Sequence, residues 1–155
     1  MIQRIQSLFL ALAALWAITI IIVNPVLLSL TASNAVYELK NLGLFTMGVG
    51  GSQMNTYPLI IALALCLVVP AFAIFKFRDR KFQMKIVRLC TIVQLAYVVL
   101  VVFYIDRANT LIGEETDVAA SPWVYTVLIA IVSSFLANRF IKKDDNLIRA
   151  ADRLR

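Results

Sequence analysis

The sequence predicts an all-α membrane protein whose four transmembrane helices form an up-down-up-down antiparallel bundle. The main observation is that nearly all charges lie between four stretches that contain no Asp, Glu, Lys or Arg. These stretches are residues 5–37, 41–75, 89–105 and 118–138. Each holds an apolar run close to the ~20 residues that a helix needs to cross ~30 Å of hydrocarbon. Because the segments outside them are too short for a core of their own, residues 1–155 form a single domain.

The expected spans are residues 5–25, 57–75, 86–105 and 122–141, followed by a short cytoplasmic tail, 142–155. Asn24-Pro25 marks the end of the first span, because proline disfavours helical geometry in the residue before it. A cleaved signal peptide is the alternative for this run, but its length favours a retained anchor. Pro70 predicts a modest kink, since neighbouring helices can satisfy the carbonyl that it frees. Short connections after the second and third spans force antiparallel neighbours.

The longer loop between the first two spans, residues 29–56, contains several glycines and two short alternating segments. Val36–Leu39 and Leu42–Phe45 are compatible with a short extracytoplasmic hairpin in residues 35–47 and equally with an irregular loop. A loop of this length without any structure is unusual in a compact protein.

The basic residues predict the orientation. With a cytoplasmic N-terminus, all lysines and arginines except Lys40 and Arg107 fall on the cytoplasmic side. Since positively charged loops stay inside, both termini are expected in the cytoplasm. The net charge of +6 then comes from basic residues that anchor the chain at the cytoplasmic face of the membrane. We therefore expect no nucleic-acid binding.

No residue pattern predicts catalysis. The chain has no histidine, which excludes imidazole ligands and the commonest general base. Cys66 and Cys90 form no C-x-x-C pair and are expected at different depths, as two reduced apolar side chains. Glu114, Glu115 and Asp117 are neighbours in a loop and favour solvation over metal binding. We therefore expect no enzyme, no catalytic residue, no cofactor and no metal site.

Polar residues inside the spans favour helix packing. Gln94 is expected to make an interhelical hydrogen bond to Ser133 or Ser134, a contact worth about 0.6–2 kcal/mol in membranes. The alternative is a substrate pathway lined by Thr91, Gln94, Ser133 and Ser134, although no ionisable side chain lies deep in a span. The indole N–H of Trp16 also needs a partner, which the sequence does not identify.

Two surfaces on the cytoplasmic side are candidate interaction sites. Basic residues near the second connection could attract anionic lipid headgroups or a partner, or could act only as topology determinants. They are Lys76, Arg78, Arg80, Lys81, Lys85 and Arg88. In the tail, Leu147, Ile148, Ala151 and Leu154 share one helical stripe and predict a helix over 144–153 that docks on a partner, the membrane or the bundle.

Three segments carry a family resemblance. They are the opening Met1-Ile2-Gln3-Arg4-Ile5-Gln6, the internal Arg88-Leu89-Cys90, and residues 144–155, which read DDNLIRAADRLR. With them the chain resembles the small four-span bacterial inner-membrane proteins grouped as a domain of unknown function. The resemblance implies a bacterial cytoplasmic membrane and no established activity. It supplies no catalytic or binding residues.

We therefore expect a non-enzymatic accessory or scaffold subunit that acts through its cytoplasmic face or helix sides. A small transporter or oligomeric channel is the alternative. The expected partners are the lipid bilayer, with anionic lipids at the cytoplasmic face, and either another membrane protein or a second copy of the chain.

Overall fold

The computed structural model describes residues 3–32, 35–47, 52–76, 79–113 and 117–153, which contain four helices and five strands. The helices are α1 (Gln3–Val23), α2 (Tyr57–Phe75), α3 (Arg80–Ile112) and α4 (Pro122–Arg153). The strands are β1 (Leu28–Thr31), β2 (Val36–Lys40), β3 (Gly43–Thr46), β4 (Ser52–Met54) and β5 (Asp117–Ala120). Within this part of the chain, all four helices are long and apolar enough to cross a membrane, which confirms the predicted fold class.

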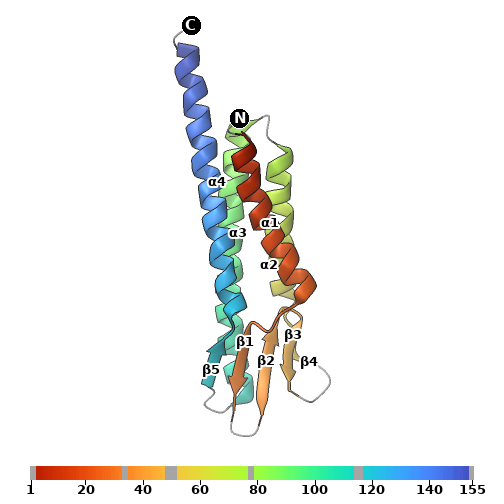
Figure 1. Cartoon of the computed structure of the whole chain (residues 1–155). Helices are drawn as coiled ribbons and strands as arrows, with labels where there is room; N and C mark the ends of the chain where they lie inside the picture. Colours follow the sequence, from red (N-terminus) through yellow and green to blue (C-terminus); the bar gives the residue numbers. More distant parts are fainter. Residues whose placement is uncertain (1–2, 33–34, 48–51, 77–78, 114–116, 154–155) are drawn as a thin grey trace.

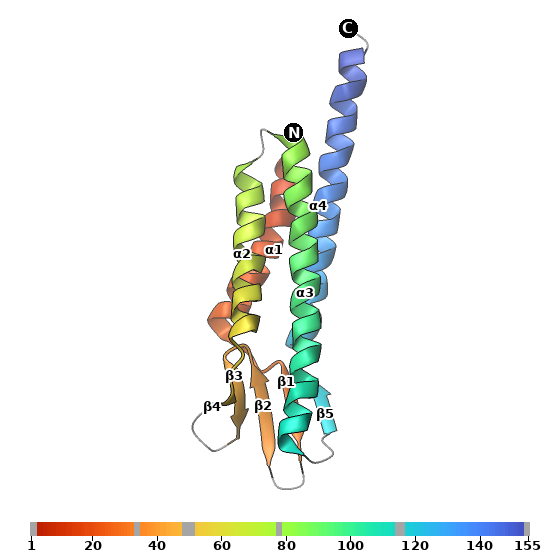
Figure 2. The same ribbon diagram turned by 180° about the vertical axis from the view of Figure 1, so that it is seen from behind.

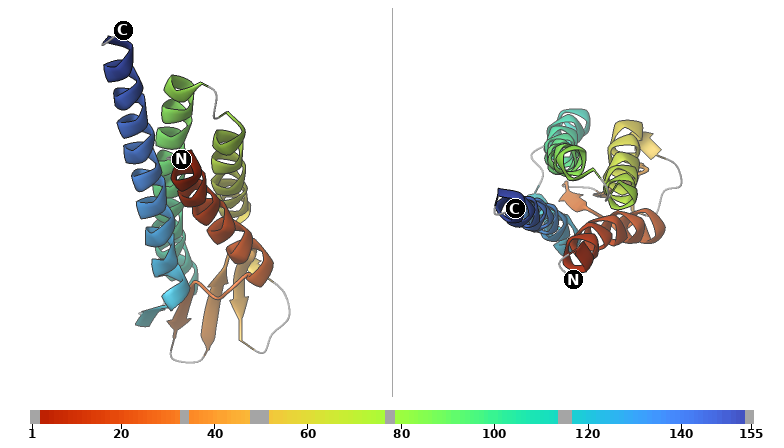
Figure 3. Two further views of the ribbon diagram at one scale, coloured as in Figure 1. Left: turned by 45° about the horizontal axis from the view of Figure 1, so that its top comes forward. Right: turned by 90° about the horizontal axis from the view of Figure 1, so that it is seen from above.

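The helices form an antiparallel bundle in which α1 and α3 each pack against both α2 and α4 (Figures 1 and 3). Both chain termini lie at one end of the bundle, which we call the terminal end. The strands lie at the opposite end, which we call the sheet end (Figure 1). α4 extends beyond the other helices at the terminal end.

Local signals explain where the helices begin and end. α1 ends at Val23 because Asn24 adopts a left-handed backbone (φ 41°), and its N–H donates to the Ile20 carbonyl. α2 coincides with the expected range 57–75. α3 begins at Arg80, earlier than the expected span 86–105, because the Asp79 carboxylate caps it by accepting from the Phe82 N–H at 3.1 Å. α4 continues through the tail as one helix, so the predicted helix over 144–153 is confirmed.

The sheet is larger than the sequence predicted. The expected hairpin in residues 35–47 is present as β2 and β3, in which Tyr37 pairs with Thr46 and Lys40 with Gly43. Among the described residues it belongs to a five-stranded antiparallel sheet with the order β4-β3-β2-β1-β5. The short strands β1 and β5 pair in the register Ser29 with Ala119, across a long separation in sequence.

Backbone hydrogen bonds join the sheet to the helices. The Leu27 N–H donates to the Leu39 carbonyl at 2.8 Å, and the Leu27 carbonyl accepts from the Ser121 N–H at 2.9 Å. The chain leaving α1 and the chain entering α4 are therefore fixed to the same point. The sheet-end part of α3 lies against one side of the sheet (Figures 1 and 2) and shares a hydrophobic core with it. This core includes Leu28, Leu30, Leu39, Leu44, Tyr104 and Ala108.

Buried polar side chains also connect the sheet to the helices. The Tyr97 hydroxyl of α3 donates to Asn41 Oδ1 at 2.8 Å, and the Thr56 hydroxyl donates to the Asn41 carbonyl at 2.7 Å. All three residues are buried. Asn41 lies in the turn between β2 and β3, so these bonds hold the hairpin against α3 and the start of α2.

Trp16, for which the sequence predicted no partner, lies beside Tyr97. Its indole Nε1–H donates to the Thr126 hydroxyl oxygen of α4 at 2.8 Å. Its ring meets the Tyr97 ring edge to face, with centroids 5.8 Å apart. The tryptophan thus connects α1 with α3 and α4.

Small residues allow α1 and α4 to approach closely. Ala13 and Ala17 of α1 and Ala130 and Ala137 of α4 are fully or almost fully buried. Since lipid is as apolar as these side chains, close backbone packing is a main source of helix association in a membrane. At the terminal end the interface finishes with a parallel stack of the Phe9 and Phe140 rings, whose centroids are 5.5 Å apart.

The Asn41–Tyr97 bond generates a prediction. Tyr97→Phe removes the donor and leaves a buried amide oxygen without a partner, so the free energy of unfolding should fall by about 1–2 kcal/mol. Tyr57→Phe is the control, because Tyr57 is 63% exposed. Reversible unfolding in mixed micelles, followed by circular dichroism, measures both. Equal effects of the two substitutions would contradict the role of the bond.

Candidate functional site

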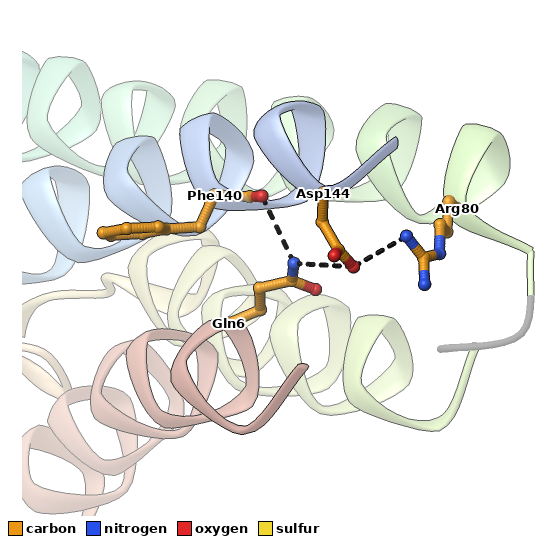
Figure 4. A network of polar contacts seen from close by, with 4 residues as sticks. All are labelled: Gln6, Arg80, Phe140 and Asp144. Atoms are coloured by element: carbon orange, nitrogen blue, oxygen red, sulfur yellow. Dashed lines mark hydrogen bonds and ion pairs between the residues drawn. The ribbon is translucent and has the colours of Figure 1, made fainter. Parts of the chain in front are cut away.

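Three helices meet in a polar network at the terminal end (Figure 4). Gln6 of α1 is buried, and its Nε2 donates to the Phe140 carbonyl at 3.3 Å and to Asp144 Oδ2 at 3.5 Å. Asp144 Oδ2 also lies 2.7 Å from Arg80 Nη1 at the start of α3. The Asp144 carboxylate therefore joins α1 and α3 to the part of α4 where the bundle ends.

The expected basic cluster divides into different roles. Arg80 is paired with Asp144, so its charge is compensated and it is not an open headgroup site. Lys81, Lys85 and Arg88 are exposed on α3. Lys76 is exposed after α2, with its Nζ 5.9 Å from the centroid of the Phe72 ring. Arg78 lies outside the described residues. Further exposed basic side chains are Arg139, Lys142 and Lys143 of α4.

Two residues of the tail stripe are described, and both are about half-exposed. Leu147 is 50% exposed and Ile148 is 42% exposed. Ile148 follows the fully buried Ile141 by seven residues, or two helical turns, so it continues the side of α4 that packs into the bundle. Ala151 lies within α4, but its side chain is not among those described, and Leu154 lies outside the described residues.

The expected bond from Gln94 to Ser133 or Ser134 is absent. Gln94 is fully buried, and neither its Nε2 nor its Oε1 has a hydrogen-bond partner among the described residues. The Ser133 hydroxyl donates to the Ile129 carbonyl of its own helix at 2.7 Å. The Ser134 hydroxyl, also fully buried, has no hydrogen-bond partner within the described chain. The polar interhelical contact is therefore incomplete.

Two of the four residues of the expected pathway, Thr91 and Ser133, form hydrogen bonds within their own helices. The Thr91 hydroxyl donates to the Val87 carbonyl at 3.2 Å, as Ser133 does within α4, and Thr91 is only half-buried. Hydroxyls that bond to the preceding turn of their own helix satisfy themselves locally. Of these four residues, only Gln94 and Ser134 have buried polar atoms without a hydrogen-bond partner among the described residues.

Gln83 has a role that the sequence analysis missed. Its side chain is buried, and its Nε2 donates to the Ala73 carbonyl at 3.1 Å. Ala73 is in the last turn of α2, where carbonyls have no partner within the helix. Gln83, Gln6 and Asp144 lie at or beyond the ends of the expected spans, which is why they were not considered as interior polar groups. Their closeness in sequence to the apolar runs was the one signal that could have indicated a role inside the bundle.

The cysteines lie at more similar depths than expected. Cys66 of α2 and Cys90 of α3 are both fully buried between the helices. The expected depths differed because α3 was assumed to begin near residue 86; with its start at Arg80, Cys90 lies further along the helix. Both thiols are free, and Ser134 lies beside Cys90. In the described chain, no group of three or more acidic, cysteine or histidine side chains could hold a metal ion.

An apolar cavity of about 190 Å³ lies between α1, α3 and α4 near the sheet end. Its walls include Trp16, Leu28, Tyr97, Val101, Trp123 and Val127. The polar atoms of Trp16 and Tyr97 are engaged with Thr126 and Asn41. Such an apolar space is dry, and it offers hydrophobic contact but no group for acid–base chemistry.

The sequence model of a family described as a domain of unknown function (DUF4293) matches residues 2–154. The chain belongs to this family. The match covers almost the whole chain and agrees with the resemblance to a domain of unknown function. No curated protein and no solved structure matches the chain significantly. The four apolar helices indicate a multi-pass membrane protein.

Two buried glutamines of α3 give a matched prediction. Gln83→Leu removes the donor to the Ala73 carbonyl and should lower the free energy of unfolding by roughly 0.6–2 kcal/mol. Gln94→Leu removes an amide without a described partner and should leave that free energy unchanged or raise it. Unfolding in mixed micelles compares the two variants. A loss with Gln94→Leu as large as that with Gln83→Leu would show that Gln94 has a bound partner, such as water.

Proposed function

We propose that the chain is a non-enzymatic accessory or scaffold subunit of the bacterial cytoplasmic membrane, which binds a membrane-protein partner through the projecting part of α4. Both termini would then be cytoplasmic, as the distribution of basic residues favours. One observation carries the proposal: α4 leaves the bundle as a continuous helix with Leu147 and Ile148 uncovered (Figures 1 and 2).

The geometry supports this proposal in two ways. At Asp144, α4 still contacts α1 and α3. Residues 145–153 extend the helix by about 13 Å beyond this residue. A helix of this length has little stability in water on its own, and covering its apolar side chains would stabilise it. The Asp144 network fixes the direction in which the helix projects, so a partner would meet a preorganised surface.

A small transporter or oligomeric channel is the second candidate, because Gln94 and Ser134 are buried without described partners. Polar groups of this kind would be satisfied in a pore or by a bound solute. The self-satisfied hydroxyls of Thr91 and Ser133 favour the scaffold over this alternative. If Gln94→Leu abolished a flux into vesicles while stability was kept, transport would become the leading function.

Orientation is the first test. Ile148→Cys should be protected from a membrane-impermeant maleimide in intact cells and should react after the cells are opened, because α4 would project into the cytoplasm. Met47→Cys, at the sheet end and 68% exposed in the wild type, should react in intact cells. The native thiols of Cys66 and Cys90 are fully buried and give a low background. Labelling of the 148 variant in intact cells would reverse the proposed orientation.

The docking surface is tested by Leu147→Asp combined with Ile148→Asp. A charge on each apolar side chain opposes its burial, so a partner that copurifies in stoichiometric amount from mild detergent should be lost while membrane insertion is unchanged. Asn146→Asp combined with Ala150→Asp is the matched control, since it adds the same charge at exposed positions of the same turns. Equal loss in both variants, or a wild type without a stoichiometric partner, would contradict the proposal.

A further inference from the structure

A groove runs between α2 and α3 on the lipid-facing side of the bundle, near the terminal end. Its volume is about 370 Å³. Val68 and Phe72 of α2 and Phe82 and Leu89 of α3 line it, and all four are exposed. Because Val68, Phe72 and Leu89 belong to the apolar runs, the part of the groove that they line would face hydrocarbon and not water.

The shape and chemistry of the groove suit an extended hydrocarbon chain. The remaining lining residues are Val69, Ile86 and Lys85, and Ile86 is buried. From Phe82 to Leu89 the groove follows α3 for about 10 Å, at 1.5 Å per residue. Apart from Lys85, every lining side chain is apolar, so the groove offers no hydrogen bond along its length.

Two uncompensated cations lie along the terminal half of this groove. Lys85 lines it, and Lys76 Nζ lies over the Phe72 ring of its wall, 5.9 Å from the centroid. Neither lysine has a carboxylate within ion-pair distance in the part of the chain that the structure describes. The Asp79 carboxylate is engaged by the Phe82 N–H, and Arg80 is neutralised by Asp144.

We propose that this groove binds one anionic glycerophospholipid, with an acyl chain between α2 and α3 and the phosphate between Lys76 and Lys85. Charge complementarity selects the occupant. An apolar groove with two free ammonium groups in its terminal half matches a molecule with a hydrocarbon chain and one anionic head. A role as topology determinants explains the lysines but not the groove beside them. The binding requires no partner on α4 and no particular orientation of the protein.

Native mass spectrometry of the full chain in a non-ionic detergent tests the site. Phosphatidylglycerol and phosphatidylcholine with identical acyl chains are the probes. Each basic side chain near an anionic lipid contributes about a fivefold gain in binding, so two lysines predict roughly a 30-fold preference for phosphatidylglycerol. Lys76→Gln combined with Lys85→Gln should bring this preference close to one. Lys142→Gln combined with Lys143→Gln removes the same charge at the same end of the bundle and should leave it unchanged.

The acyl chain is tested separately. Val68→Trp fills the groove without changing charge and should weaken the binding of both lipids severalfold while the preference remains. An equal loss of preference in the two lysine variants would show general charge attraction and overturn the site. Unchanged lipid binding by the Val68→Trp variant would show that the acyl chain does not lie in the groove. Displacement of phosphatidylglycerol by millimolar inorganic phosphate would indicate a simple anion site instead.

Discussion

Inside hydrocarbon, each backbone N–H and C=O group must find its partner within the protein, and this constraint organises the whole chain. Four helices satisfy it along their lengths, so the difficult positions are the helix ends. At the terminal end of α2, the Phe72 carbonyl accepts from the Lys76 N–H, and the Ala73 carbonyl accepts from the Gln83 side chain. At the sheet end, Leu27 both donates to Leu39 and accepts from Ser121. The sheet itself is a way of pairing the backbone where α1 and α4 leave the membrane.

The interior polar side chains of α3 show both outcomes of burial. Gln83, Gln94 and Tyr97 are all buried within one bundle, but only Gln83 and Tyr97 reach described partners, one on α2 and the other in the β2–β3 turn. These two side chains fix the position of α3 along the bundle axis, Gln83 relative to α2 and Tyr97 relative to the β2–β3 turn. Gln94 lies between them and has no such function. Burial of its amide carries a free-energy penalty of about 1–3 kcal/mol unless a bound molecule, such as water, forms hydrogen bonds with it.

The distribution of charges predicted the spans well because a charged side chain is costly in hydrocarbon, and α2 begins and ends where expected. It predicted the helix ends poorly for the same reason. Arg80, Lys81 and Lys85 were placed in a connection, although charged residues extend a helix freely once it has left the lipid. Asp79, an N-cap residue type directly before the helix, was a usable start signal.

The sheet and the candidate sites were less accessible from sequence. β1 and β5 are four residues each and are recognisable as strands only through their mutual pairing, which joins Ser29 with Ala119. The Trp16–Thr126 bond likewise depends on which helices are neighbours. The tail stripe was visible as a pattern, because helical spacing is local. The α2/α3 groove was not, since it requires the relative height of two helices.

The two longest helices are longer than a membrane crossing requires, and their extra lengths lie at opposite ends of the bundle. α3 has 33 residues and α4 has 32, so each is about 50 Å long, whereas ~30 Å suffices to cross the hydrocarbon. The surplus of α3 lies against the sheet (Figure 2). Tyr104 and Ala108 are buried in this part of the helix. On the surplus of α4, Leu147 and Ile148 are half-exposed, although Ile148 continues the buried side of the helix. The chain thus covers one helical extension with its own strands and leaves apolar side chains of the other half-exposed, which supports the proposal that a second protein covers them.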